Sequence, residues 1–121
     1  MKNLTLNEYQ EGAMSTCMES SNNFMYMLTG LTAEVGEIND KIAKAIRKEW
    51  IKIDDNNVLP LNGCPIEFAE ELAKEISDCL WFCAGLSQIV GYDLNKIGNI
   101  NLEKLASRKQ RGVIDGNGDT R

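Results

Sequence analysis

The chain has 121 residues, of which 43% are hydrophobic and 26% charged, and its formal net charge is −5. This length suits one globular domain and leaves no room for two, and the acidic balance disfavours binding to a nucleic acid polymer. The chain contains no histidine, which excludes a Ser-His-Asp triad, a Cys-His pair and imidazole general-base chemistry.

The sequence lacks the signals of membrane insertion and secretion. No apolar run approaches the roughly 20 residues that span a bilayer, and the first residues do not form the apolar stretch of a signal peptide. We therefore expect a cytoplasmic protein that does not contact a membrane. The cysteines show no C-x-x-C spacing, which argues against a zinc knuckle or a thioredoxin-like motif.

Helices are expected over nearly the whole chain. The first is predicted to begin at Thr5, where Thr5 and Glu8 have the spacing of a capping box, and to end near Glu19. The second is predicted from about Phe24 to Lys48, because its apolar residues recur at steps of three and four. These residues are Leu28, Leu31, Val35, Ile38, Ile42, Ala45 and Ile46.

Residues 50–65 interrupt the helical pattern. Acidic and amide residues at 54–57, then Pro60 and Gly63, are turn signals. The apolar residues between them are compatible with a short β-hairpin as well as with a loop. We therefore expect an inserted loop or short hairpin between the second and third helices.

The second half of the chain predicts two more helices. Pro65 suits the first turn of a third helix, and Gly91 is well placed to end it. Asp93 suits the N-cap of a fourth helix that ends near Arg111. Four helices joined by short connections imply an all-α fold, an antiparallel four-helix bundle.

We expect one all-α domain over residues 1–111 and a separate tail. Residues 112–121 contain three glycines and little to bury, so this tail is predicted to be flexible by itself. It could become ordered on a ligand or on a neighbouring subunit.

Two acidic pairs carry the chemistry of this sequence: Glu34-x-x-Glu37 in the second helix and Glu75-x-x-Asp78 in the third. Residues three apart share a helix face, with Cβ atoms about 5–6 Å apart. The acids border the apolar stripes, and partly buried carboxylates without a cation would be unfavourable. If the two helices face each other, the four carboxylates converge on a site for a divalent cation with hard oxygen ligands.

The alternative interpretation is a solvated acidic face. Lys41, Lys44 and Lys74 lie close enough in sequence to pair with these acids. The spacing of the acids alone leaves the two interpretations near even.

Longer segments resemble a known family. Residues 31–40 (LTAEVGEIND) and 71–82 (ELAKEISDCLWF) resemble the MazG-like nucleotide pyrophosphohydrolases, all-α enzymes whose signature is E-x-x-E followed downstream by E-x-x-D. The block at 101–108 (NLEKLASR) and the terminal run from Arg111 also resemble members of that family. The insertion at 50–65 makes the gap between the acidic pairs longer than the family usually shows, which the slow growth of loop-closure entropy tolerates.

The resemblance implies Mg²⁺-dependent hydrolysis of a nucleoside or deoxynucleoside triphosphate between its α- and β-phosphates, with Mn²⁺ as an alternative cofactor. The products would be the monophosphate and pyrophosphate. The implied metal ligands are Glu34, Glu37, Glu75 and Asp78. Either Glu34 or Glu37 would also orient the attacking water.

Residues for the substrate are suggested by the third and fourth helices. Lys104 and Arg108, four residues apart, suit phosphate oxygens, and Asn101, one turn earlier, suits a sugar or phosphate contact. Phe82 follows Asp78 by one turn, where its ring could stack on a base. For the basic pair the alternative is a solvated helix face, and for Phe82 core packing is about equally supported.

Self-association is expected, because long helices in a short chain leave apolar surface that a second copy could cover. The resemblance implies a homodimer or a homotetramer. A different class of function, a catalytically silent helical interaction module with the same fold, is the alternative to the enzyme. The intact set of four acids favours the enzyme.

Overall fold

The computed structural model describes residues 1–51 and 66–121. Within these ranges the chain forms four α-helices and one short 3-10 helix, and no strand. The prediction of an all-α fold is therefore confirmed. The helices are α1 (Leu6–Met14), η1 (Glu19–Ser21), α2 (Phe24–Arg47), α3 (Ile66–Ile89) and α4 (Leu94–Arg111). The predicted loop or hairpin at 50–65 lies, beyond Ile51, outside the described residues.

Local capping explains where most of the helices begin. The Thr5 hydroxyl accepts a hydrogen bond from Glu8 N at 3.1 Å and the Glu8 carboxylate accepts one from Thr5 N at 2.9 Å, which completes the predicted capping box. Asn23 caps α2, and Asp93 caps α4 as predicted. These signals act within a few residues, so they could be recognised in the sequence.

The first helix is shorter than predicted, because α1 ends at Met14 rather than near Glu19. The hydroxyls of Ser15 and Thr16 donate to the carbonyl oxygens of Gly12 and Ala13. Such side-chain hydrogen bonds compete with continuation of the helix.

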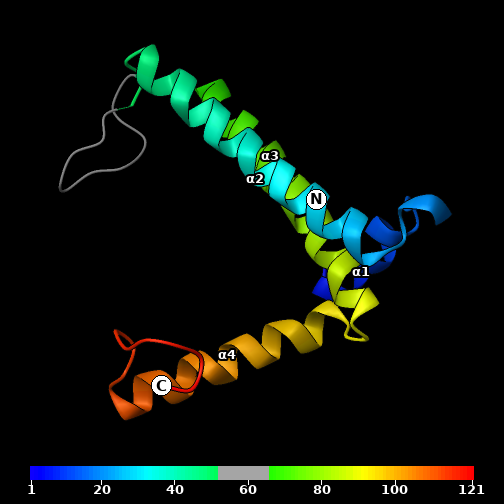
Figure 1. Cartoon of the computed structure of the whole chain (residues 1–121), viewed down its shortest axis with the longest axis vertical. Coiled ribbons are helices and arrows are strands. Elements are labelled where there is room, and N and C mark those ends of the chain that lie inside the picture. Colours follow the sequence, from blue (N-terminus) through cyan, green and yellow to red (C-terminus); the bar gives the residue numbers. More distant parts are fainter. Residues whose placement is uncertain (52–65) are drawn as a thin grey trace.

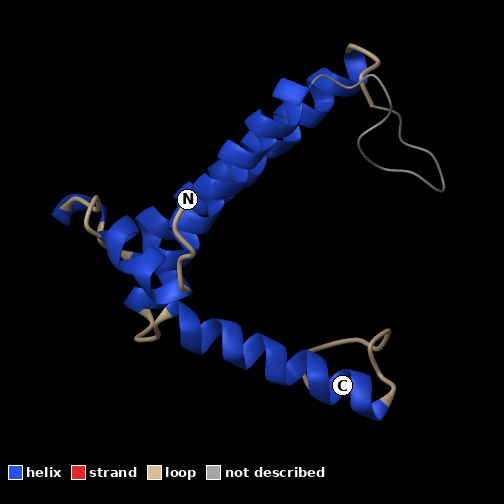
Figure 2. Cartoon of the chain, turned by 180° about the vertical axis from the view of Figure 1, so that it is seen from behind, coloured by secondary structure: helices blue, strands red, loops and turns tan. Residues whose placement is uncertain are grey.

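The long helices α2 and α3 form an antiparallel hairpin (Figures 1 and 2). Near the start of α2, Met27 is fully buried and lies where a side chain at Gly85 of α3 would be. At the other end a small core of Ala45, Ile51 and Phe68 closes the hairpin. These contacts set which residues of the two helices lie opposite each other.

The short helix α1 braces the junction between α3 and α4. The Gln10 amide donates to Ala84 O and accepts from Leu94 N, both at 3.0 Å and both buried. Nearby, the Asn7 and Asn95 side chains each accept a hydrogen bond from the other residue's main-chain N–H. The direction in which α4 leaves the hairpin is therefore determined by contacts with α1.

From this junction α4 extends away from the hairpin as a separate arm, with the C-terminal tail beside it (Figures 1 and 2). Its first residue, Leu94, is buried, whereas Ile97, Leu102 and Leu105 further along are exposed. Beyond the junction, the hairpin and the arm thus present two separate surfaces within the described residues (Figures 1 and 2). No helix in the described ranges is long and apolar enough to cross a membrane.

Candidate functional site

Three acidic side chains converge where the middle of α2 faces the middle of α3. Glu34, Glu75 and Asp78 each offer one carboxylate oxygen, and these oxygens all lie within 4.8 Å of one another. The spacing of Glu75 and Asp78 places both on one face of α3, and the antiparallel pairing brings Glu34 to that face. We call these three residues the acidic cluster.

The geometry and chemistry of the acidic cluster fit a divalent cation. Oxygen ligands lie about 2.0–2.6 Å from Mg²⁺ or Ca²⁺, so ligands of one ion are at most about 4–5 Å apart. The three oxygens satisfy this limit. Glu34 and Glu75 are half-buried and Asp78 is exposed, so the cluster is open to a ligand from solvent.

Glu37, the fourth predicted ligand, does not place a carboxylate oxygen in this group. Its side chain is exposed, one turn along α2 from Glu34. Its charge nevertheless acts on the cluster, because it contributes to raising the pKa of Glu34. Its roles as a metal ligand and in orienting water remain predictions.

The electrostatics of the cluster favour a cation. Burial raises the pKa of the Glu34 carboxyl, and the charges of Asp78, Glu75 and Glu37 raise it further. Burial followed by the charges of Glu34 and Asp78 also raises the pKa of the Cys79 thiol. The carboxylates therefore lie in a field of their own sign, which a bound cation would relieve.

Lysines neutralise only one side of the acidic cluster. Lys41 Nζ lies 3.2 Å from Glu75 Oε1 and 3.4 Å from Glu71 Oε2. Lys44 instead contacts Asp40, at 2.6 Å on the same helix. Neither Glu34 nor Asp78 forms an ion pair within the described residues. The solvated-face interpretation thus accounts for Glu75 but not for its two neighbours.

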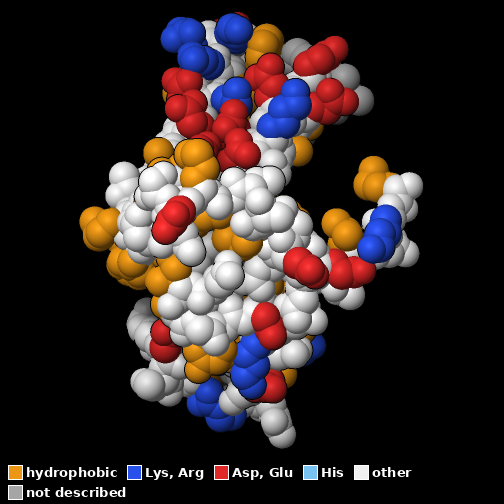
Figure 3. Space-filling model, turned by 90° about the vertical axis from the view of Figure 1, so that its right-hand side faces the viewer, with side chains coloured by type: hydrophobic (Ala, Val, Ile, Leu, Met, Phe, Trp, Pro, Cys, Tyr) orange, Lys and Arg blue, Asp and Glu red, His pale blue; other side chains and the backbone are white. Residues whose placement is uncertain are grey.

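Charged side chains gather over the end of the hairpin where α2 finishes and α3 begins, as the upper part of Figure 3 shows. Acidic and basic groups are interleaved there, whereas hydrophobic side chains reach the surface lower in the same view. A depression at this end of the hairpin is lined by Lys41, Lys44, Lys48, Trp50, Glu67, Phe68 and Glu71. Lys41 thus links the acidic cluster to this mixed-charge surface.

Phe82 lies in the interface between α2 and α3. Its ring is 9% exposed and contacts Gly30, with the ring of Tyr26 at a centroid distance of 6.0 Å and that of Trp81 at 5.0 Å. These contacts support the core-packing interpretation. A role in stacking on a base remains a prediction.

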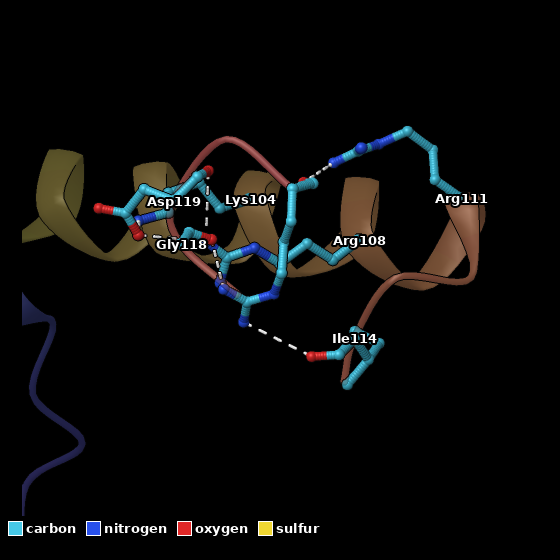
Figure 4. Close-up of polar contacts among 7 residues, drawn as sticks. Lys104, Arg108, Arg111, Ile114, Gly118 and Asp119 are labelled. Carbon is cyan, nitrogen blue, oxygen red and sulfur yellow. Dashed lines mark hydrogen bonds and ion pairs between the residues drawn. The ribbon is translucent and has the colours of Figure 1, made fainter. Parts of the chain in front are cut away.

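The predicted phosphate-binding residues lie on the α4 arm, away from the acidic cluster on the hairpin (Figure 1). Lys104 Nζ and Arg108 Nη2 lie 3.0 and 3.2 Å from the same oxygen, Oδ1 of Asp119 (Figure 4). Asn101, about two turns before Arg108, is exposed. The structure therefore brings Lys104 and Arg108 together, but with a carboxylate of their own tail rather than with the acidic cluster.

Asp119 is a residue of this arrangement that was not predicted from the sequence. The residue is one acid in a glycine-rich segment, and its spacing from Lys104 and Arg108 has no helical periodicity because the chain turns back after Gly112. Gly112 adopts a left-handed conformation with φ of 70°, which ends α4. The glycine at this position was a signal of a reversal in the sequence.

Comparison with known proteins places the chain in a family. The model of the MazG nucleotide pyrophosphohydrolase domain matches residues 23–113, which contain α2, α3 and α4. The chain therefore belongs to the MazG nucleotide pyrophosphohydrolase family, as the resemblance of residues 31–40 and 71–82 predicted, and its helices are those of a MazG-type bundle.

A relative from a virus supports this assignment. The chain is 34% identical to the Gene 37 protein of Mycobacterium phage L5 over 104 residues, which are 85% of this chain and 81% of that protein. No solved structure matches the chain at a significant level.

Proposed function

We propose that this protein hydrolyses nucleoside or deoxynucleoside triphosphates between the α- and β-phosphates, with Mg²⁺ as cofactor, to give the monophosphate and pyrophosphate. The convergence of Glu34, Glu75 and Asp78 within 4.8 Å, in a chain of this family, is the observation that carries the proposal. Mn²⁺, which also accepts oxygen ligands, would serve as an alternative cofactor to Mg²⁺.

The acidic cluster would hold the metal through its three carboxylates. A bound Mg²⁺ supplies neutralisation of phosphate oxygens and acidification of a water molecule. Among the described residues Glu37 is exposed and outside the cluster, and its carboxylate would accept a proton from the attacking water. Glu34, which has a raised pKa, is the other candidate for this role.

Lys104 and Arg108 would bind the phosphates, with Asn101 at the sugar or a phosphate and Phe82 near the base. The basic pair lies on the α4 arm and the acidic cluster on the hairpin of α2 and α3. A complete site in this arrangement needs the arm of one copy beside the hairpin of another. We therefore also propose that the protein acts as a homodimer or homotetramer.

Exposed apolar side chains support self-association. The arm exposes Ile97, Leu102 and Leu105, and the hairpin exposes Val35 and Ile76. Isolated apolar residues are common on protein surfaces, but rows of them on two unpaired helices suit a helix–helix interface. Light scattering after size-exclusion chromatography should give a multiple of the 13.5 kDa chain mass. A monomer at all concentrations would contradict the proposal.

Product analysis tests the reaction. Incubation with dNTPs and Mg²⁺ should release pyrophosphate, and release of orthophosphate alone would contradict the proposed bond. Asp78→Asn, Glu75→Gln and Glu37→Gln should each lower turnover by at least about 100-fold, equivalent to about 2.7 kcal/mol of transition-state stabilisation. Circular dichroism should show that the helices remain.

Asp40→Asn is the matched control for these variants. Asp40 is an exposed acid on α2 that contacts Lys44 and does not belong to the acidic cluster. Its replacement should leave turnover within about twofold of the original value. The silent interaction module would show no turnover with any nucleotide and no change in thermal stability on addition of Mg²⁺.

A further inference from the structure

The C-terminal tail folds back over α4 and places its own carboxylate on the basic pair. Asp119 Oδ1 accepts from both Lys104 and Arg108, and the main-chain oxygen of Asp119 accepts from Arg108 Nη2 at 3.4 Å (Figure 4). A single oxygen atom thus neutralises two cations. The contact lowers the pKa of Asp119, chiefly through the hydrogen bond from Lys104, so the carboxyl group stays ionised.

A few hydrogen bonds within the last residues hold the tail beside α4. Arg111 donates to the Arg121 carbonyl, and Arg121 donates back to the Gly118 carbonyl and, at 3.5 Å, to that of Ile114. Gly118 has a φ of 78°, a conformation that glycine adopts without strain. The tail is therefore closed on itself as a loop around the side chains of the basic pair.

The loop restricts access to the Arg108 guanidinium and leaves the Asp119 carboxylate exposed. The Arg108 side chain is 9% exposed, whereas that of Asp119 is 83% exposed. Asp119 occupies Nη2 of the Arg108 guanidinium, so a ligand that binds this nitrogen would have to displace the tail. The Lys104–Asp119 pair contributes little to holding the tail, because both of its side chains are exposed, at 41% and 83%.

We propose that Asp119 is an internal substitute for a phosphate group, and that the tail (residues 113–121) is a latch that opens when a polyphosphate binds Lys104 and Arg108. This inference rests on the proposed phosphate-binding role of those two residues. A diphosphate offers separate oxygens to the lysine and to the planar guanidinium, and it carries more charge than one carboxylate. It would therefore displace Asp119 from both cations.

Calorimetric titration of the full chain with inorganic pyrophosphate in EDTA tests the latch without a metal in the acidic cluster. Asp119→Asn should bind pyrophosphate about tenfold more tightly than the original chain, which corresponds to a latch that is closed about nine-tenths of the time. Asp115→Asn is the matched control. It removes the same charge from the same tail, and Asp115 forms no ion pair within the described residues, so the affinity should change less than about twofold.

Lys104→Gln separates the latch from the proposed function on which it rests. If pyrophosphate binding is weakened by Lys104→Gln but is the same in Asp119→Asn and the original chain, the latch is wrong and the phosphate site stands. If Asp119→Asn weakens binding, Asp119 positions the cations rather than competing with the ligand, and the latch is again wrong. If no variant binds pyrophosphate, or binding persists in Lys104→Gln combined with Asp119→Asn, the phosphate site and the latch both fail.

Hydrogen exchange provides a readout that does not depend on affinity. Pyrophosphate should increase the amide exchange of residues 113–121 in the original chain, because the tail is released. The same addition should leave exchange in that segment unchanged in Asp119→Asn, where the latch is already open. Slower exchange of the tail on binding would overturn the proposal.

Discussion

Gly30 on α2 lies directly against the aromatic ring of Phe82 on α3. A Cβ atom at residue 30 would be 2.8 Å from Phe82 Cδ1 and closer still to two further ring atoms. The ring is buried and Phe82 follows Asp78 by one turn of α3. The absence of a side chain at residue 30 therefore sets the separation of the two helices beside the acidic cluster.

Gly30→Ala should destabilise the protein, because the buried ring must move to admit a methyl group. Overpacking of this kind costs about 1–3 kcal/mol, which urea unfolding would measure. Turnover should also fall, since separation of the helices moves Glu34 away from Glu75 and Asp78. An unchanged free energy of unfolding would show that the ring relocates without strain.

Gly36→Ala serves as the control on the same helix. A Cβ atom at residue 36 would have no neighbour within 4 Å. Replacing a glycine in a helix interior by alanine stabilises by about 0.5–1 kcal/mol. In the same unfolding experiment, Gly30→Ala should therefore lower the free energy of unfolding and Gly36→Ala should raise it.

Glu34→Gln should stabilise the metal-free protein in a pH-dependent manner. The pKa of Glu34 in the folded chain is raised above its ordinary value, first by burial and then by three acidic neighbours. Below the ordinary pKa the carboxyl is protonated in both the folded and unfolded chains, so the variant and the original should be equally stable. As the pH rises through the pKa of Glu34 in the folded chain, this carboxyl ionises in an unfavourable environment. The original chain then becomes less stable than the variant.

Thermal melts in EDTA at a series of pH values measure this difference. Removal of the Glu34 charge should be worth a few tenths of a kcal/mol, or roughly 2 °C in Tm for a chain of this size. Saturating Mg²⁺ should reverse the order at neutral pH, since the variant has lost a carboxylate ligand. A variant that is less stable than the original in EDTA at neutral pH would contradict the like-charge account.

Lys41→Gln should make the protein more dependent on a divalent cation. Lys41 pairs with Glu75 and Glu71, and these contacts raise its pKa, so it stays charged at neutral pH. Without it the metal-free Tm should fall, and the increase in Tm on addition of Mg²⁺ should be larger than in the original chain. Lys44→Gln, which removes only the Asp40 contact on the same helix, should change neither quantity appreciably.

Gln10→Ala should weaken the junction from which α4 projects. The substitution leaves the buried Leu94 N–H without its partner and removes one of the hydrogen bonds to the Ala84 carbonyl, which lies within α3. A buried group left unpaired costs about 1–3 kcal/mol, so a loss of about 1–3 kcal/mol in the free energy of unfolding is expected. Amide exchange at Leu94 should accelerate, whereas Glu11→Ala, an exposed change on α1, should leave it unchanged.

Much of the molecule could be predicted from residues that are close in sequence. The caps at Thr5 and Asp93 and the periodic apolar residues indicated helices, because these interactions act within one or two turns. The resemblance of residues 31–40 and 71–82, which contain the two acidic motifs, indicated the family. The predicted end of α1 lay about five residues beyond the observed one. The hydroxyls of Ser15 and Thr16 donate hydrogen bonds to carbonyl oxygens that a continuing helix would use.

The sequence by itself determined that the chain is helical, which acids share a helix face and which family it belongs to. Only the tertiary structure decided that Glu34 joins Glu75 and Asp78 while Glu37 stays outside, because that depends on how α2 and α3 pack around Gly30 and Phe82. Contacts far apart in sequence likewise determine the direction of α4 and the position of Asp119 on Lys104. The physical reason is the same in each case: helical spacing defines a face, but packing between distant segments defines what that face meets.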